Sequence, residues 1–311
     1  MLVALAGGVG AARLLSGLVE VADPASITAV VNTGDDTALH GLHISPDIDT
    51  VTYTLAGMDN TETGWGVAGE TWNVMEALGG IGGATWFALG DRDLATHLYR
   101  SGRLADGATL SDITGELAAA RGVATRLLPM SDDPVRTKLT VALDGVEREV
   151  DFQHYFVGLG HGVPVSAIRF DGAESSIPAP GVLDAIAGAE LVVACPSNPL
   201  VSIAPLLAVP GIAAAVAARR PDVVAVSPIV AGAALKGPAD RLLRELGHEA
   251  TVVGVARLYA PWAGTLVIDT ADQALAPLVE AEGLRCVVAP TVMSSADRAA
   301  ALAAVVLDAR R

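Results

Sequence analysis

Cysteine and aromatic residues are both scarce in this chain of 311 residues. Two cysteines, Cys195 and Cys286, are too few for a disulfide framework, and each follows an apolar run. We therefore expect buried thiols in a reducing compartment. Aromatic residues make up 4% of the chain and apolar residues 51%, so the core must be built from Ala, Val, Leu and Ile. This composition favours helices packed on a sheet.

Basic residues are outnumbered by acidic ones, and long apolar runs are missing. Lys and Arg number 20 against 35 Asp and Glu, and the formal net charge of -15 argues against non-specific nucleic-acid binding. Backbone amides and a metal ion can still hold a phosphate locally. No apolar stretch reaches membrane-spanning length, and the N-terminal run has no basic residue before it and breaks at Gly7 and Gly8. We therefore expect a cytoplasmic protein with no membrane partner.

Short apolar runs alternate with helical patterns along most of the chain. An N-terminal strand is predicted before Gly7, and further strands at 27–32, 84–90, 191–196, 223–228, 250–255, 265–269 and 285–290. Helices are predicted at 94–105, 110–122, 181–189, 212–220, 238–247, 272–283 and 294–311. The alternation predicts an α/β fold, Rossmann-like, with a mainly parallel sheet and helices on both of its faces.

The segment from about 125 to 170 breaks this alternation. Four runs there have the pattern of strands without intervening helices: 125–131, 137–143, 147–157 and 165–170. Asp144 and Gly145 between the second and third are a hairpin turn signal. We predict one domain over 1–311, with a small antiparallel insertion in an α/β subdomain at about 107–170.

A glycine-rich turn, "LAGGVGAAR", follows the first predicted strand and precedes a helix. Gly7, Gly8 and Gly10 would let backbone amides approach a phosphate at the helix N-terminus. The spacing is neither the full dinucleotide fingerprint nor a P-loop. The alternative is a tight turn that only packs the helix on the sheet.

Acidic side chains follow the second predicted strand in "VVNTGDDTALHGLHISPDIDT". Asn32, Asp35 and Asp36 leave the strand at its carboxyl end, where open α/β sheets bind ligands. Asp47 and Asp49 can return to the same place. Carboxylates beside a phosphate would repel it unless a divalent cation such as Mg²⁺ lies between them. The alternative is a solvated acidic loop that caps a helix starting near Thr50.

Two further polar turns follow predicted strands. "LGDRDLATH" carries Arg92, which can bind a phosphate or form a surface pair with aspartate, and His97, more simply explained as a residue of the helix face. "CPSNP" holds Ser197 and Asn198 between two prolines, a rigid turn suited to a nucleobase, ribose or phosphate. Lys236 can help neutralise a phosphate or stay a lone exposed lysine. Together these turns predict an enzyme that binds a phosphorylated nucleotide with a divalent metal and catalyses phosphoryl-type transfer.

These motifs together resemble the 2-phospho-L-lactate transferase family, called phosphoenolpyruvate transferase in actinobacteria. The resemblance rests on the GDD, PDxDT, LGDRDLATH and PSNP elements and covers nearly the full length. It implies a transferase of coenzyme F420 biosynthesis that uses Mg²⁺. Its acceptor would be the deazaflavin precursor Fo, and its donor a guanosine diphosphate carrying lactate or enolpyruvate. The ribityl hydroxyl of Fo attacks the terminal phosphate and GMP leaves. The family is often homodimeric.

The resemblance also implies roles for individual residues. Gly7, Gly8 and Gly10 would lie on the nucleotide diphosphate, and Asp35 and Asp49 would be the metal-side, catalytic carboxylates. Asp49 with Arg92 would contact Fo. The remaining nucleotide-binding residues would be Asn32, Ser197, Asn198 and Pro199.

Two other functions stay open at this point. Gluconeogenesis-factor-like proteins share the fold but serve as regulatory nucleotide-binding proteins. The presence of Asp49, "GDRD" and "GETWN" on the predicted Fo side favours the transferase. An uncharacterised sugar-nucleotide-binding module is a third alternative.

Overall fold

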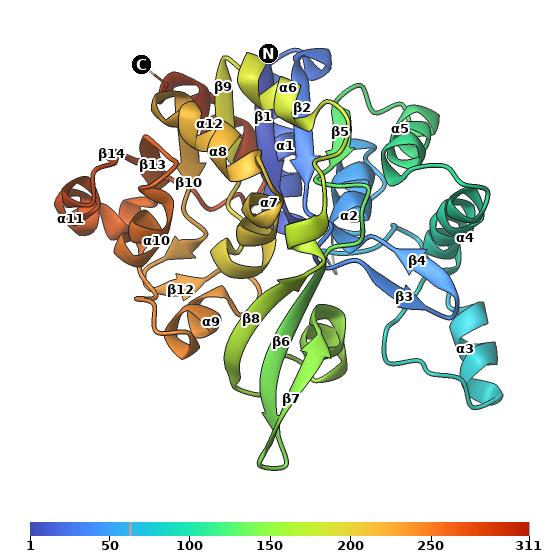
Figure 1. The fold of residues 1–311 in the computed structure, drawn as a ribbon. Coiled ribbons are helices and arrows are strands. Elements are labelled where there is room, and N and C mark those ends of the chain that lie inside the picture. The colour runs from blue at the N-terminus through green and yellow to red at the C-terminus, as the bar shows by residue number, and fades with distance from the viewer. Residues whose placement is uncertain (62–63, 311) are drawn as a thin grey trace.

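A parallel sheet forms the centre of the computed structural model, which describes residues 1–61 and 64–310 (Figure 1). Within that part of the chain the sheet has seven strands in the order β14-β13-β10-β9-β1-β2-β5. Their bounds are β1 Leu2–Ala6, β2 Ile27–Val31, β5 Arg126–Pro129, β9 Leu191–Ala194, β10 Val223–Val226, β13 Thr265–Ile268 and β14 Arg285–Val288. The strand order reverses between β1 and β9, and such a switch point is where open α/β sheets bind ligands.

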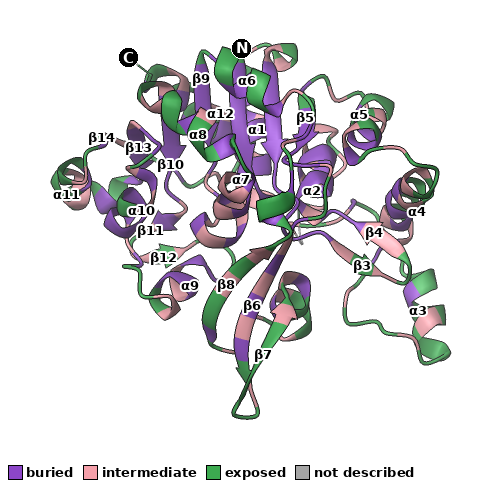
Figure 2. Cartoon of the chain, in the orientation of Figure 1, coloured by how far each residue is buried: buried purple, intermediate pink, exposed green. Residues whose placement is uncertain are grey.

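Helices cover both faces of the sheet, as predicted. Alternate strand residues point to opposite faces, so Leu2 and Ala4 join one core and Val3 and Leu5 the other. Four helices pack in the first core: α1 Gly8–Val21, α2 Pro46–Leu55, α5 Leu110–Ala120 and α12 Ala296–Asp308. The second core holds α6 Val182–Gly188, α7 Ala204–Ala208, α8 Ile212–Ala218, α9 Ala239–Glu245, α10 Val252–Tyr259 and α11 Ala276–Ala281. Figure 2 shows the strands buried between these layers.

Two smaller units project from the carboxyl edge of the sheet (Figure 1). One is an antiparallel sheet in the order β7-β6-β8, which spans β6 Arg136–Leu143, β7 Val146–Asp151 and β8 Val165–Asp171. The other combines the hairpin of β3 Thr37–Leu39 and β4 Leu42–Ile44 with α3 Asn73–Gly80 and α4 Asp91–Ala105. A further short hairpin pairs β11 Ile229–Val230 with β12 Ala233–Ala234.

Several predicted elements are confirmed and three are wrong. The hairpin at Asp144 and Gly145 joins β6 to β7, and both residues have positive φ, as such a turn requires. Residues 84–90 form no strand, and 250–255 begin α10 instead, because Thr251 caps a helix whose buried residues follow helical spacing. The run at 125–131 joins the main sheet as β5 rather than the antiparallel insertion.

Other element boundaries also differ from the prediction. The end of the run at 147–157 is a π-helical turn, His154–Gly158, and α2 begins at Pro46 rather than near Thr50. Arg311, the predicted last residue of the final helix, lies outside the described residues. The subdomain at about 107–170 stays a proposal. Among the described residues, no single helix is both long and apolar enough to cross a membrane. One bent pair of helices has the length and composition to do so, Pro199–Ala208 with Ile212–Ala218.

Gly17 allows α1 and α12 to cross closely. A Cβ at Gly17 would collide with the backbone carbonyl of Ala299, whereas a Cβ at Gly115, exposed within α5, would meet nothing. We expect Gly17→Ala to lower the free energy of unfolding by about 1–3 kcal/mol, because relieving the clash would require one of the two helix backbones to move. Gly115→Ala should raise it by about 0.5–1 kcal/mol through reduced backbone entropy. Urea denaturation of both variants measures this, and equal effects would contradict the packing described.

Candidate functional site

A cavity of about 940 Å³ opens at the carboxyl ends of the central strands. Loops that follow β1, β2, β9, β10 and β14 line it on the sheet side, together with the first turns of α2. The segments between α2 and α4, the turn after β7 and the loop before α9 form its other walls. Its position at the switch point explains why residues from so many loops meet there. A cavity of this size can hold one large or two smaller ligands.

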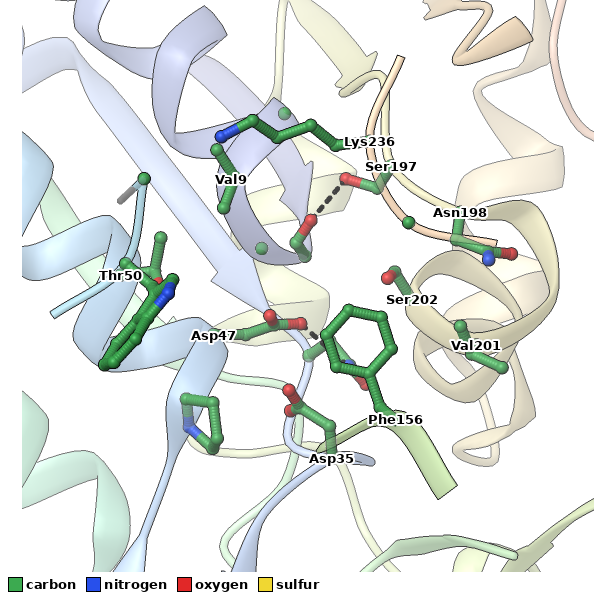
Figure 3. Close-up of a pocket in the computed structure, with 18 of the residues that line it drawn as sticks. Val9, Asp35, Asp47, Thr50, Phe156, Ser197, Asn198, Val201, Ser202 and Lys236 are labelled. Atoms are coloured by element: carbon green, nitrogen blue, oxygen red, sulfur yellow. Dashed lines mark hydrogen bonds between the residues drawn. The ribbon is translucent and has the colours of Figure 1, made fainter. Parts of the chain in front are cut away.

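The glycine loop fits tightly between β1 and β9. Gly8 opens α1 with a φ of 68°, a left-handed conformation that favours glycine. A Cβ at Gly10 would collide with the carbonyl oxygen of Pro196, and the Ser197 hydroxyl donates a hydrogen bond of 2.7 Å to the Gly7 carbonyl (Figure 3). The loop after β9 is therefore fastened to the glycine loop, and both line the cavity.

Asp47 and Asp35 form a pair of buried carboxylates beside the glycine loop (Figure 3). Burial is the main cause that raises the pKa of both, to about 7 for Asp47 and well above its usual value for Asp35. The charges of Asp47 and Asp36 further raise the pKa of Asp35, and Asp36 also raises the pKa of Asp47. The Asn32 amide, which donates to Asp47 at 2.9 Å, and the Gly8 backbone amide lower the pKa of Asp47. The carboxylate of Asp47 thus lies at the α1 N-terminus, where the sequence predicts a phosphate.

Oxygens of Asp35 and of the adjacent Asp36 could accept a divalent cation. Among the described residues Asp35 Oδ1 and Asp36 Oδ1 are buried without a hydrogen-bond partner. Gln153, from the turn after β7, holds the other Asp35 oxygen at 3.4 Å, and His43 and Ser45 hold Asp36 Oδ2. Buried carboxylate oxygens without a proton donor are suitable ligands for Mg²⁺.

Asp49 lies in a second buried group on α2 and α4. Suitable ligand atoms of Asp49, Asp93 and His97 lie within 4.8 Å of one another, so this group could also hold a metal ion. The two oxygens of Asp49 accept hydrogen bonds from the Arg100 guanidinium. Burial raises the pKa of the Tyr53 hydroxyl, and that hydroxyl donates to Asp93 at 2.6 Å. Asp49 therefore already has a cationic partner, whereas Asp35 has none among the residues that the structure describes.

Aromatic rings form the wall opposite the sheet. Trp65, Trp86, Phe152 and Phe156 line the cavity. The Phe152 and Phe156 rings stack with centroids 5.5 Å apart, and Trp86 packs on His154 at 5.7 Å. The segment before α4 and the turn after β7 thus close one side of the cavity together. A flat ring system would find stacking partners there.

The structure brings most of the predicted site residues to this cavity. Its lining among the described residues includes Gly7, Gly8, Gly10, Asn32, Asp35, Asp49, Ser197 and Asn198. Arg92 and Pro199 are not part of that lining. Arg92 is exposed and donates to the Ala68 carbonyl at 2.9 Å, and Pro199 is buried at the start of the turn after β9. The roles assigned to all of these residues remain predictions.

Sequence reasoning missed the aromatic wall, Arg100 and the loop 291–294. The aromatic residues lie in segments that follow no strand of the main sheet, so no strand-end rule points to them. A signal for Arg100 existed, because Asp93, His97 and Arg100 have the i, i+4, i+7 spacing of one helix face. Asp269 holds the loop 291–294 by accepting from the Thr291 amide at 2.7 Å.

Comparisons with known proteins agree with this picture. The family model described as 2-phospho-L-lactate transferase CofD matches residues 2–296. A Streptomyces griseus protein named phosphoenolpyruvate transferase is 48% identical over 306 residues, which cover 97% of this chain and 96% of the relative. The proteins of the same name from Thermobifida fusca and Mycolicibacterium smegmatis are 45% and 40% identical, covering 99% and 98% of this chain and 97% of each relative.

A solved structure shares the fold. The crystal structure of a member of the UPF0052 family from Bacillus halodurans superposes with a TM-score of 0.61 at 17% identity, and the match covers 98% of both chains. At this identity the likeness concerns the fold alone. The family model and the full-length relatives go further, and by them this chain belongs to the CofD family of 2-phospho-L-lactate transferases.

Proposed function

We propose that this protein is a phosphoenolpyruvate transferase of coenzyme F420 biosynthesis. It would move the phosphoenolpyruvate moiety from its guanosine diphosphate derivative to the ribityl hydroxyl of Fo. Relatives of that name match over nearly the full length at 40–48% identity. The observation that carries the proposal is one cavity with a glycine turn, buried carboxylates and an aromatic wall.

The reaction needs both substrates in the cavity together. The hydroxyl oxygen of Fo attacks the phosphorus that bears the acid, the bond from that phosphorus to the bridging oxygen of GMP breaks, and GMP leaves. The hydroxyl gives up its proton. Because little covalent chemistry is left for the protein, its main tasks are to position the two substrates and to stabilise charge. The cavity volume of about 940 Å³ is consistent with two ligands.

The two sides of the cavity suit the two substrates. The loops after β1 and β9 offer backbone amides and the side chains of Ser197 and Asn198 to a nucleotide. The rings of Trp86 and Phe156 on the opposite wall suit the flat ring of Fo. Asp35, Asp47 and Asp49 line the cavity as well, which suits transfer at a phosphate between the two ligands.

Mg²⁺ would be held by Asp35, one of the two carboxylates that the resemblance points to, and by Asp47 beside it. The second, Asp49, already has Arg100 as its cationic partner. When bound, Mg²⁺ would neutralise phosphate oxygens during transfer. The unpartnered Asp35 oxygen supports this assignment most directly. The homodimer that the resemblance implies is also a proposal, and light scattering of the purified protein tests it.

Mg²⁺ should stabilise the protein more strongly as the pH rises. The pKa of Asp47, about 7 in the folded chain, exceeds its ordinary value, so the folded metal-free protein holds an extra proton between roughly pH 4 and pH 7. That contribution to stability is present at low pH and is lost as the pH rises through the folded pKa. Mg²⁺ must displace this proton. In thermal melts, Mg²⁺ should therefore raise the melting temperature slightly at about pH 5 and more strongly at about pH 8. Equal increases at the two pH values would contradict binding of Mg²⁺ at Asp47.

Binding of Fo separates the transferase from the regulatory alternative. Fluorescence titration of the purified protein with Fo, with and without GDP and Mg²⁺, should show saturable binding that tightens with GDP. A gluconeogenesis-factor-like protein would bind GDP without Fo. That result would overturn the proposed function and remove Fo-side roles from Asp49 and Arg92.

A further inference from the structure

Arg100 is a fully buried guanidinium behind Asp49, with 0% of its surface exposed. Its Nη1 donates to Asp49 Oδ2 at 3.0 Å and its Nη2 to Asp49 Oδ1. Asp49 lines the cavity, whereas Arg100 is not part of the lining among the described residues. Arg100 can therefore affect a ligand in the cavity only indirectly, through the side chains to which it donates hydrogen bonds.

The other contacts of Arg100 fix the same part of the site. Its Nη1 lies 3.3 Å from His97 Nδ1 and 3.4 Å from the His43 carbonyl oxygen. Because a guanidinium only donates, His97 Nδ1 accepts, and the other ring nitrogen, Nε2, lies 3.2 Å from an Asp93 oxygen. Arg100 thus orders Asp49 and the imidazole of His97 from one side.

Stability alone does not explain this arrangement. Burying an ion pair costs desolvation that the attraction between the charges only partly repays, so apolar residues of similar volume would serve the fold equally well. A bidentate Arg–carboxylate pair instead fixes the plane of the carboxylate. The charge of Asp49 is also already matched, which leaves its cavity side to orient a neutral donor such as a hydroxyl.

We propose that Arg100 is a positioning residue that holds the Asp49 carboxylate in the orientation that binds the acceptor hydroxyl. The inference rests on the proposed function, since it takes Fo as the ligand that Asp49 contacts. It predicts that Arg100 contributes to acceptor binding only through Asp49. A purely structural arginine would affect stability without this dependence.

A double-mutant cycle tests the dependence. The Kd for Fo is measured by fluorescence titration, with GDP and Mg²⁺ present, for the wild type, Arg100→Gln, Asp49→Asn and the double variant. Each single substitution should weaken Fo binding about ten- to a hundredfold. The double variant should bind no more weakly than Asp49→Asn, because Arg100 has nothing left to position. GDP affinity should stay within about twofold in all four proteins.

Matched variants keep the outcome decisive. Arg103→Gln removes the neighbouring arginine of α4, whose partner Glu116 lies away from the cavity, and should leave Fo binding unchanged. If Arg100→Gln does not fold, Arg100→Lys replaces it in the same cycle. Losses that multiply in the double variant, or an Arg100 variant that binds Fo like the wild type, would overturn the inference. Absence of Fo binding by the wild type would instead overturn the proposed function.

Discussion

Asp35→Asn is expected to reduce Mg²⁺-dependent transfer about a hundred- to a thousandfold while leaving the metal-free protein at least as stable as the wild type. The carboxylate would no longer neutralise Mg²⁺ next to the transferred phosphate. The same substitution removes one of two neighbouring buried carboxylates, Asp35 and Asp47, whose pKa values are both raised. The free-energy cost of burying their charges therefore falls. Activity and stability should therefore change in opposite directions, as is common at functional sites.

Steady-state turnover and thermal melts without Mg²⁺ measure the two effects. Asp184→Asn is a suitable control, because Asp184 is exposed on α6 and does not line the cavity. Wild-type turnover in Asp35→Asn would remove Asp35 from the metal site. A lower melting temperature with unchanged turnover would make Asp35 a structural residue.

Removing the aromatic wall should abolish tight binding of Fo while sparing the nucleotide. In the double variant Trp86→Ala/Phe156→Ala the flat acceptor loses stacking worth about 1–3 kcal/mol per ring, so its Kd should rise by roughly one and a half to four orders of magnitude. GDP affinity should change little, because its predicted contacts lie on the loops after β1 and β9. Fluorescence titration and calorimetry give the two constants.

Ile81→Ala is the matched control for the aromatic wall. Ile81 is 84% exposed, lies in the same segment between α3 and α4, and does not line the cavity. Equal losses of GDP and Fo affinity in the double variant would show that the wall supports the whole cavity rather than one ligand.

The sheet and half of the site could be predicted because they obey one rule. Continuous apolar runs in the sequence predicted the strands β1, β2, β9 and β10. Because these strands are parallel, the polar turns that follow them meet at the carboxyl edge of the sheet, where ligands bind. The local sequence pattern predicted the wrong element where burial in the tertiary fold favoured another one. The segment 250–255 has strand-like residues, yet a helix buries Val252 and Val255 better.

The remaining parts of the site come from segments that no local pattern brings together. Trp86 and His154 pack on each other from two loops that are far apart in the sequence. The Arg100–Asp49 pair joins α4 to α2, and either residue alone is consistent with an exposed helix face. Such contacts depend on the tertiary fold and only the coordinates reveal them.

The transfer reaction itself is the most direct test of the proposed function. Purified protein is incubated with Fo, the enolpyruvyl diphosphoguanosine donor and Mg²⁺, and the products are followed by mass spectrometry. We expect dehydro coenzyme F420-0 and an equal amount of GMP from the wild type, with almost none of either from Asp35→Asn. Hydrolysis of the donor without a deazaflavin product, or product formation that is unchanged in Asp35→Asn, would contradict the proposal.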